Sequence, residues 1–187
     1  YFPEEELLTF RKIESRLQGH AHIKTPGVEM SGGSLGQGLS FGIGTALASR
    51  LDCRDSRTYV LLGDGECDEG QVWEAAMSAS HNKLDNLVAL VDRNQIQNDR
   101  WTWEVMNLEP LPDKWRAFGW YTQEVNGHDL GEVMAALDRA SRTEGQPSAI
   151  IAHTVKGKGV SFMENNPDFH GKAPSEEQLA QALREIG

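Results

Sequence analysis

The sequence predicts an α/β fold, a mainly parallel sheet flanked by helices, and three observations support it. Four short apolar segments, each continuous enough to be buried on both faces, indicate strands at 58–64, 87–93, 120–126 and 148–155. Helical patterns alternate with these segments, and connections of this length require right-handed crossovers between parallel strands. The 187 residues, of which 39% are hydrophobic and 25% charged, are enough to bury one core. We therefore expect a single domain over residues 1–187.

Capping residues and apolar periodicity predict the helices. They lie at about 36–51, 70–83, 129–142 and 174–187. In the third helix we expect a capping box from Asp129 to Glu132. The apolar side chains predicted to share one face of that helix are Leu130, Val133, Met134 and Leu137. In the last helix, Ser175 is the expected N-cap and Gln178 stands three residues further on.

The acidic composition limits the classes of partner. A net charge of −10, from 28 acidic and 18 basic residues, argues against nucleic acid or an anionic membrane surface. No stretch reaches about 18 uninterrupted apolar residues. The opening YFPEEELL has no signal-peptide pattern, and its lack of a Met indicates a fragment or a processed chain. Cys53 and Cys67 lack a metal-type spacing and favour reduced thiols over a disulfide, so we expect a cytoplasmic protein.

The segment LLGDGECDEG (61–70) combines a glycine turn with four carboxylates and contains no lysine or arginine. Asp64 directly follows a strand, and Gly63 and Gly65 let the backbone approach a ligand closely. The segment lacks the Lys and Ser/Thr of a P-loop, and its glycines lack the spacing of a dinucleotide fingerprint. The following helix offers N–H groups to an anion, and a divalent cation can join that anion to a carboxylate. We therefore expect Asp64 to bind Mg²⁺ that also binds a diphosphate.

Asn94 supplies the second half of this pattern. It follows the strand at 87–93 and stands 30 residues after Asp64. One βαβ unit brings the two strand ends side by side, at the edge of a parallel sheet where ligands bind. Alone, a Gly-Asp-Gly is more often a turn, and an Asn after a strand is more often a cap or an Asx turn. Together, at successive strand ends, they predict one shared cation site.

Gly63-Asp64-Gly65 followed by Asn94 resembles the thiamine diphosphate motif, and its flanks are similar to the transketolase family. The similar segments are TPGVEMSGGSLGQGLSFGIGTALA (25–48), GDGECDEGQVWEAAMSASHNKLDNLVALVDRNQIQND (63–99), LEPLPDKWRAFGW (108–120) and FHGKAPSEEQ (169–178). The resemblance covers essentially the whole chain and is closest to the split form, in which the diphosphate-binding half is a separate subunit.

The resemblance implies a thiamine diphosphate-binding fold and an enzyme of pentose phosphate metabolism. The implied reaction is transfer of a two-carbon ketol (glycolaldehyde) unit from a ketose to an aldose. It implies two cofactors, thiamine diphosphate and Mg²⁺ or another divalent cation such as Ca²⁺ or Mn²⁺.

The resemblance also implies roles for individual residues. The metal ligands would be Asp64, Asn94 and the main-chain carbonyl of Ile96. Gly65 N–H would bind the diphosphate, and Asp92 would lie near the thiazolium ring. The full set of implied cofactor-binding residues is Gly33, Ser34, Leu35, Gly63, Asp64, Gly65, Asp92, Asn94 and His170, of which the first three would lie along the aminopyrimidine ring. Ser34 stands where the family often has Pro.

Two histidines are implied to be catalytic, because proton transfer to sugar hydroxyls needs a group that titrates near neutral pH. His20 would contact the substrate, and His170 would lie near the diphosphate and the substrate hydroxyls. Glu69 matches a glutamate that links two active sites across a dimer interface. Glu66 and Asp68 have no implied role and are interpreted as acids at a helix N-terminus. The histidines expected to play no part are His22, His81, His128 and His153.

The resemblance implies that a complete site needs more than these 187 residues. The glutamate that activates the pyrimidine ring lies on the family's pyrimidine-binding domain, and the family's N-terminal segment precedes the matched region. We therefore expect a chain that is inactive without a pyrimidine-binding (C-terminal) transketolase subunit. We expect a homo- or hetero-oligomer acting on a sugar or sugar phosphate. Lys156 and Lys158 belong to VKGKGV (155–160), which could contact a phosphate, although a solvated loop is the preferred interpretation.

Other interpretations of the sequence lead to different functions. One alternative is a subunit of another thiamine diphosphate enzyme, of the 1-deoxyxylulose-5-phosphate synthase type or the 2-oxoacid dehydrogenase alpha type. Such a subunit would share the metal motif, but segments 108–120 and 169–174 favour transketolase. A non-catalytic cofactor-binding or regulatory subunit is a second alternative, against which the intact Asp64, Asn94 and His170 argue. A plain nucleotide-binding domain is disfavoured because the phosphate fingerprints are missing.

Overall fold

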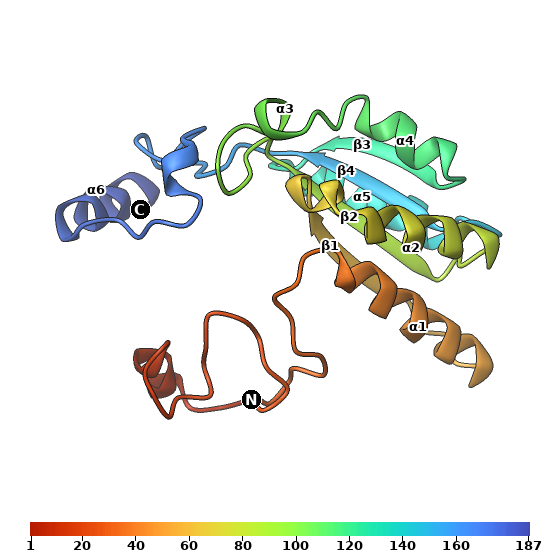
Figure 1. The fold of residues 1–187 in the computed structure, drawn as a ribbon, viewed down its shortest axis with the longest axis horizontal. Helices are drawn as coiled ribbons and strands as arrows, with labels where there is room; N and C mark the ends of the chain where they lie inside the picture. Colours follow the sequence, from red (N-terminus) through yellow and green to blue (C-terminus); the bar gives the residue numbers. More distant parts are fainter.

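The computed structural model describes residues 1–187 and contains one four-stranded parallel sheet. The strands are β1 (Thr58–Gly63), β2 (Leu87–Arg93), β3 (Tyr121–Asn126) and β4 (Ser148–His153). Their order across the sheet is β1-β2-β4-β3, and every neighbouring pair is parallel (Figure 1). The predicted α/β fold with a parallel sheet is confirmed, and all four predicted strands are present.

Helices cover both faces of this sheet (Figure 1). The α-helices are α1 (Gln37–Leu51), α2 (Gly70–His81), α3 (Thr102–Val105), α4 (Leu111–Ala117), α5 (Leu130–Ser141) and α6 (Glu176–Ile186). Three 3₁₀ segments complete the chain: η1 (Glu4–Thr9), η2 (Gly65–Asp68) and η3 (Pro167–Phe169). The four predicted helices correspond to α1, α2, α5 and α6, and α3 and α4 are two further short ones.

Two apolar clusters join the helices to the sheet. The larger one lies between the sheet and α1, α2 and α4, with Leu39, Leu62 and Trp115 among its fully buried side chains. The smaller one packs α5 against the other face, on Val88 and Ile150. Successive strand residues point to opposite faces, so strands buried on both sides are apolar throughout. This burial fixes the sheet and, with it, the strand ends that carry the polar motifs.

The predicted apolar face of α5 is only partly correct. Val133 and Leu137 pack against the smaller cluster, but Leu130 and Met134 are 77% and 66% exposed. The fully buried positions of α5 are alanines. Small side chains at these positions let the helix backbone approach the sheet closely, and this turns the two larger side chains outward.

The predicted capping box at the start of α5 is half formed. The Asp129 carboxylate accepts a hydrogen bond from Glu132 N at 3.1 Å, as an N-cap side chain should. The Glu132 carboxylate instead accepts from Asn126 N at 2.7 Å, because the chain folds back tightly from the end of β3. In α6, by contrast, Ser175 and Gln178 form a complete capping box.

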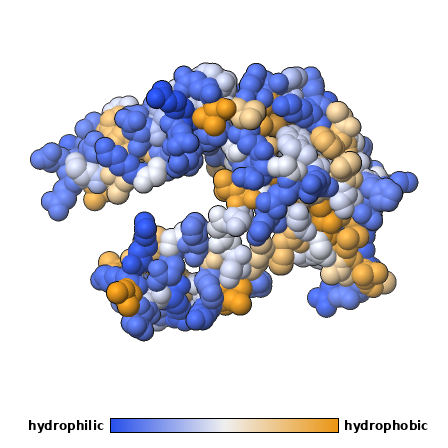
Figure 2. Space-filling view, in the orientation of Figure 1, coloured by the Kyte–Doolittle hydropathy of each residue, from blue (hydrophilic) through white to orange (hydrophobic).

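The two ends of the chain extend beyond the carboxyl ends of the strands. Most of residues 1–36 and the segment that ends in α6 lie away from the sheet (Figure 1), and an open space separates them (Figure 2). Both arms expose large apolar side chains, among them Leu7, Leu8, Phe10, Ile13, Leu179, Leu183 and Ile186. No helix of the chain is both long and apolar enough to span a membrane.

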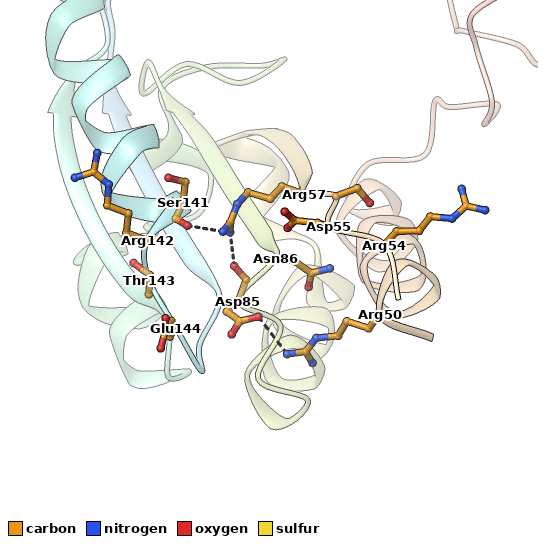
Figure 3. A pocket seen from close by; sticks show the side chains of 11 residues that line it. Arg50, Arg54, Asp55, Arg57, Asp85, Asn86, Ser141, Arg142, Thr143 and Glu144 are labelled. Carbon is orange, nitrogen blue, oxygen red and sulfur yellow. Dashed lines mark hydrogen bonds and ion pairs between the residues drawn. The ribbon is translucent and has the colours of Figure 1, made fainter. Parts of the chain in front are cut away.

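A polar hollow of about 290 Å³ lies at the opposite end, below the amino ends of the strands. Two of its four arginines bind backbone carbonyls of neighbouring loops (Figure 3). Arg57 donates to Asp85 O at 2.9 Å and to Ser141 O. Arg50 donates to Asn82 O at 2.8 Å and pairs with the Asp85 carboxylate at 3.2 Å. These guanidinium groups therefore tie together the loops that enter the sheet.

Candidate functional site

A second hollow, of about 300 Å³, lies at the carboxyl ends of β1 and β2. The register places Gly63 of β1 opposite Asp92 of β2, so the residues that follow them leave the sheet side by side. The lining residues are Leu35, Gly63, Asp64, Gly65, Glu66, Asp92, Asn94, Ile96, Gln97, Asn98, Lys156 and His170. The fold thus gathers most of the predicted site residues around one space.

Asp64 is a buried carboxylate at the centre of this group, with only 2% of its surface exposed. Its two oxygens accept hydrogen bonds from Gly65 N at 2.9 Å and Gln95 N at 2.6 Å. Burial raises the pKa of Asp64 above its ordinary value, and these two backbone hydrogen bonds only partly oppose that shift. No basic side chain forms an ion pair with it. The negative charge is therefore held in place without being neutralised.

Asn94 is 7% exposed, and its neighbours determine which way its amide faces. Its Nδ2 donates to Asp92 Oδ2 at 3.0 Å, because a carboxylate can only accept. Its Oδ1 is on the other side and accepts from Ile96 N at 3.0 Å. The other Asp92 oxygen accepts from the Thr154 hydroxyl. Asp92 thus orients Asn94 so that the amide oxygen faces away from the carboxylate.

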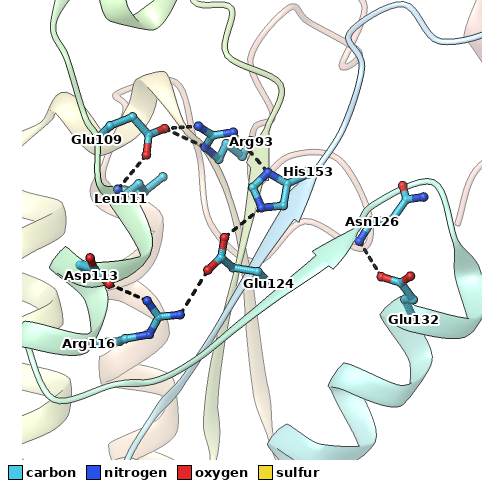
Figure 4. A network of polar contacts seen from close by, with 9 residues as sticks. All are labelled: Arg93, Glu109, Leu111, Asp113, Arg116, Glu124, Asn126, Glu132 and His153. Atoms are coloured by element: carbon cyan, nitrogen blue, oxygen red, sulfur yellow. Dashed lines mark hydrogen bonds and ion pairs between the residues drawn. The ribbon is translucent and has the colours of Figure 1, made fainter.

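Arg93 lies between Asp92 and Asn94 in the sequence, but its side chain binds residues outside the hollow (Figure 4). Its guanidinium forms an ion pair with Glu109 and lies 3.2 Å from His153 Nδ1. The other nitrogen of His153 lies 3.1 Å from a Glu124 oxygen. These contacts link the ends of β2, β4 and β3. They leave the carboxylates of the hollow without an arginine partner.

The glycine turn brings the backbone close to a polar side chain. A Cβ at Gly65 would lie 2.6 Å from Gln97 Cβ, so no larger residue fits there. The Gly65 N–H, which we expected to bind the diphosphate, donates to Asp64 in this structure. Gln97 Oε1 is buried without a hydrogen-bond partner. An unpartnered buried oxygen next to a buried carboxylate favours a cationic ligand.

Two residues of the hollow were missed or misjudged from the sequence. Lys156 follows β4 and lines the space, so the loop at 155–160 is not merely solvated, while Lys158 is exposed and pairs with Glu164. Glu66 is not simply an acid at a helix N-terminus, since η2 has only four residues. Its carboxylate binds two backbone N–H groups. The only signal in the sequence was a carboxylate directly after the glycine turn.

The histidines and the remaining predicted residues divide between two places. His170 lines the hollow, and burial, followed by the charge of Lys156, lowers the pKa of its imidazole. His20 lies outside this hollow, with its ring beside Gly33, where an added Cβ would come within 3.0 Å of His20 Cγ. Ser34 and Glu69 are exposed and do not line the space. The structure therefore gathers the predicted metal ligands but not every predicted contact.

A family profile described as the thiamine diphosphate binding domain of transketolase matches residues 2–187. The chain belongs to the transketolase family. The resemblance inferred from the motifs is thereby confirmed, and the domain is the one that binds thiamine diphosphate in this family of transferases.

Several transketolase relatives are separate subunits. The 6-deoxy-6-sulfo-D-fructose transketolase subunit of Clostridium sp. (strain MSTE9) is 45% identical, over 100% of this chain and 68% of its own. An apulose-4-phosphate transketolase subunit from Phocaeicola vulgatus is 46% identical, over 95% of this chain and 63% of its own. The transketolase of Homo sapiens is 40% identical, and the chain covers 30% of it. The chain thus spans about two thirds of the separate subunits and a smaller share of the single-chain enzyme.

A solved transketolase has the same fold. The crystal structure of transketolase from Campylobacter jejuni superposes with a TM-score of 0.91 at 35% sequence identity, covering 98% of this chain and 30% of that one. The sheet and its flanking helices are therefore those of a transketolase diphosphate-binding domain.

The residues of the hollow suit a transketolase cofactor held through a divalent cation. Among them, the predicted ligands Asp64, Asn94 and Ile96 offer one carboxylate, one amide oxygen and one main-chain carbonyl, all oxygen donors of the kind that Mg²⁺ prefers. The chain has no group of three or more His, Cys, Asp or Glu side chains that could hold a metal. The predicted ligand set contains a single carboxylate and therefore does not depend on such a group.

Proposed function

We propose that the chain is the diphosphate-binding half of a split transketolase, which transfers a two-carbon ketol unit from a ketose to an aldose. The observation that carries the proposal is the buried, un-neutralised Asp64 beside the oriented Asn94, in a domain of the transketolase family. A site with surplus negative charge needs a cation before it can accept a diphosphate. Mg²⁺, or Ca²⁺ or Mn²⁺ in its place, meets that requirement.

In this proposal Asp64, Asn94 and the Ile96 carbonyl hold the cation. Lys156 would face the diphosphate as the basic residue of the hollow. When bound, thiamine diphosphate supplies the electron sink on which cleavage of the sugar carbon–carbon bond depends. The chain's own residues position the reactants and move protons.

The two histidines differ in what supports their proposed roles. Burial and the charge of Lys156 lower the pKa of His170, which favours the neutral imidazole, the form that can accept a proton from a sugar hydroxyl. His20 lies outside the hollow, against the loop that contains Gly33. We assign it to a substrate contact that would form once the arms are packed.

A partner subunit with the pyrimidine-binding domain would complete the site. Relatives of this chain are named as transketolase subunits, and both arms of the chain expose apolar side chains that an isolated domain would leave in water. Glu69 would lie at an interface between sites. The relatives' names contain a sulfonated sugar and a sugar phosphate, and we propose a sugar or sugar phosphate substrate here, in the cytoplasm.

Calorimetric titration of thiamine diphosphate tests this proposal. It is done with Mg²⁺ and then with EDTA, on the chain alone and with a pyrimidine-binding transketolase subunit. We expect Mg²⁺-dependent binding that tightens when the partner is present, followed by ketol transfer in a sugar screen. Binding without turnover on any sugar would favour a non-catalytic subunit, and turnover of pyruvate would favour the other thiamine diphosphate enzymes. Absence of binding under all conditions would refute the proposal.

A further inference from the structure

The loop at 33–36 is held against the hollow by a side chain for which the sequence suggested no role. Glu66 Oε1 accepts a hydrogen bond from Gly36 N at 2.7 Å, and its Oε2 accepts from Gly63 N at 3.1 Å. One carboxylate thus joins the end of β1 to Gly36, which lies 30 positions before Glu66 in the chain. Hydrogen bonds from N–H groups to a charged acceptor are among the stronger ones.

The same peptide group is held from its other side. Gln71 Nε2, at the start of α2, donates to Leu35 O at 2.7 Å. The Leu35 carbonyl and the Gly36 N–H belong to one peptide bond, so both of its polar groups are bound by side chains of the 66–71 segment. Rotation of that peptide would break both hydrogen bonds at once. Its orientation is therefore fixed.

The approach of this loop depends on glycine. Gly36 has a φ of 82° and caps α1 without a side-chain hydrogen bond. A Cβ there would lie 2.8 Å from Gln71 Cγ and 3.0 Å from Glu69 Cβ. The neighbouring Leu35 is 57% exposed and lines the hollow together with Asp64 and His170. The position of the peptide thus sets the position of the Leu35 side chain over the site.

We propose that Glu66 is a positioning residue for cofactor binding. By holding the 35–36 peptide it fixes residues 33–35 where the ring end of thiamine diphosphate would lie, an inference that rests on the proposed function. The two hydrogen bonds of Glu66 go to the loop and to the end of β1, so we assign Glu66 to holding the loop and Asp64 to the cation. In this proposal the positioning of the loop by Glu66 favours cofactor binding more than the negative charge of Glu66 disfavours it.

Glu66 has two opposing effects on cofactor binding: its hydrogen bonds position the loop, and its charge repels the diphosphate. Glu66→Gln separates them, because it removes the charge and leaves one of the two N–H groups without an acceptor. If Glu66 were only a nearby acid, removing its charge would tighten binding of thiamine diphosphate. Positioning predicts the opposite, a Kd for thiamine diphosphate raised about tenfold, the order expected for one lost hydrogen bond to a charged group. Asp68→Asn is the matched control, since it removes the same charge from the same segment without touching the loop.

A second ligand distinguishes positioning of the ring end from general damage to the site. Mg²⁺-pyrophosphate carries the diphosphate without the rings, so its Kd should be unchanged in Glu66→Gln. Gln71→Ala should weaken thiamine diphosphate binding in the same selective way. The double variant should lose less than the product of the two single effects, because both side chains hold one peptide.

The measurements are made by calorimetry on the chain with its partner subunit, once circular dichroism has verified folding. If Glu66→Gln does not fold, Gln71→Ala, a change at a partly exposed position, carries the test alone. Equal or tighter thiamine diphosphate binding in the variants, or an equal loss of Mg²⁺-pyrophosphate, would overturn the inference while leaving the proposed function intact. A wild-type chain that binds neither ligand would overturn both.

Discussion

The two ends of the sheet carry hollows of nearly equal size, about 300 Å³ at the carboxyl ends and 290 Å³ at the amino ends, yet their charges are arranged differently. At the amino ends, Arg50 and Arg57 are satisfied by carbonyls and by Asp85 of the same chain. At the carboxyl ends, Asp64 is buried without a basic partner. Unmatched charge, rather than the amount of charge, marks the candidate site.

The topology explains the difference between the ends. In a parallel sheet the helices that follow the strands point their N–H groups toward the carboxyl edge, where loops diverge and ligands bind. The amino edge receives chain segments that return from helices, and its arginines hold their carbonyls in place. The carboxyl end is therefore the candidate binding end, whereas the amino end stabilises the loops that enter the sheet.

The largest effect that tests this comparison is expected at Asp64. Asp64→Ala should weaken Mg²⁺-dependent thiamine diphosphate binding by more than about a hundredfold, beyond the range for residues that only support a metal ligand. Calorimetry measures the Kd. Asp85→Ala, the same change at the other end, should leave binding within about twofold while it lowers stability. Retained Mg²⁺-dependent binding in Asp64→Ala would mean that the carboxyl-end hollow is not the cation site.

The two cysteines provide a second test, since one lies near each end. Cys53 follows α1 and is exposed, whereas Cys67 in η2 is fully buried, and burial raises the pKa of its thiol. We expect one thiol to react with Ellman's reagent in the native chain, and the second at least about a hundredfold more slowly until the chain is unfolded. Cys53→Ser should abolish the fast phase. Two fast thiols would show that the loop at 65–68 opens readily.

The arginines of the amino end should affect stability and not binding. Arg57→Ala removes donors to Asp85 O and Ser141 O, and we expect a loss of about 1–2 kcal/mol in the free energy of unfolding. Urea denaturation measures it. Arg54→Ala is the control, because that side chain is 72% exposed and should cost less than about 0.5 kcal/mol. If Arg57→Ala weakened cofactor binding, the two ends would not be independent.

The smallest effect is a pH dependence of the cation-free chain. The pKa of Asp64 is raised in the folded state, so the native chain holds that proton more tightly than the unfolded chain. The resulting contribution to stability is present at low pH and is lost as the pH rises from the ordinary value of 3.8 through the folded pKa. The unfolding free energy of wild type minus that of Asp64→Asn should therefore fall between pH 4 and 7. A difference that rises over this range would mean that the carboxylate is neutralised within the chain.

The sequence by itself determined the four strands, four of the six α-helices and the pair of residues on which the proposed site depends. Apolar continuity revealed the four strands, and the capping box of Ser175 and Gln178 was evident from spacing alone. Asp64 and Asn94 could be paired because any right-handed βαβ unit places successive strand ends together. These features depend on interactions within a few residues or on one general rule of chain topology.

The tertiary structure decided what surrounds that pair. Lys156 lines the same hollow as Asp64 only because β4 pairs with β2, and Glu66 binds Gly36 only because α1 packs next to the end of β1. The outward turn of Leu130 and Met134 depends on how closely α5 approaches the sheet. Such contacts join residues far apart in the chain, and periodicity and capping describe only neighbours. A charge or an apolar side chain acquires its role from the partner that folding places against it.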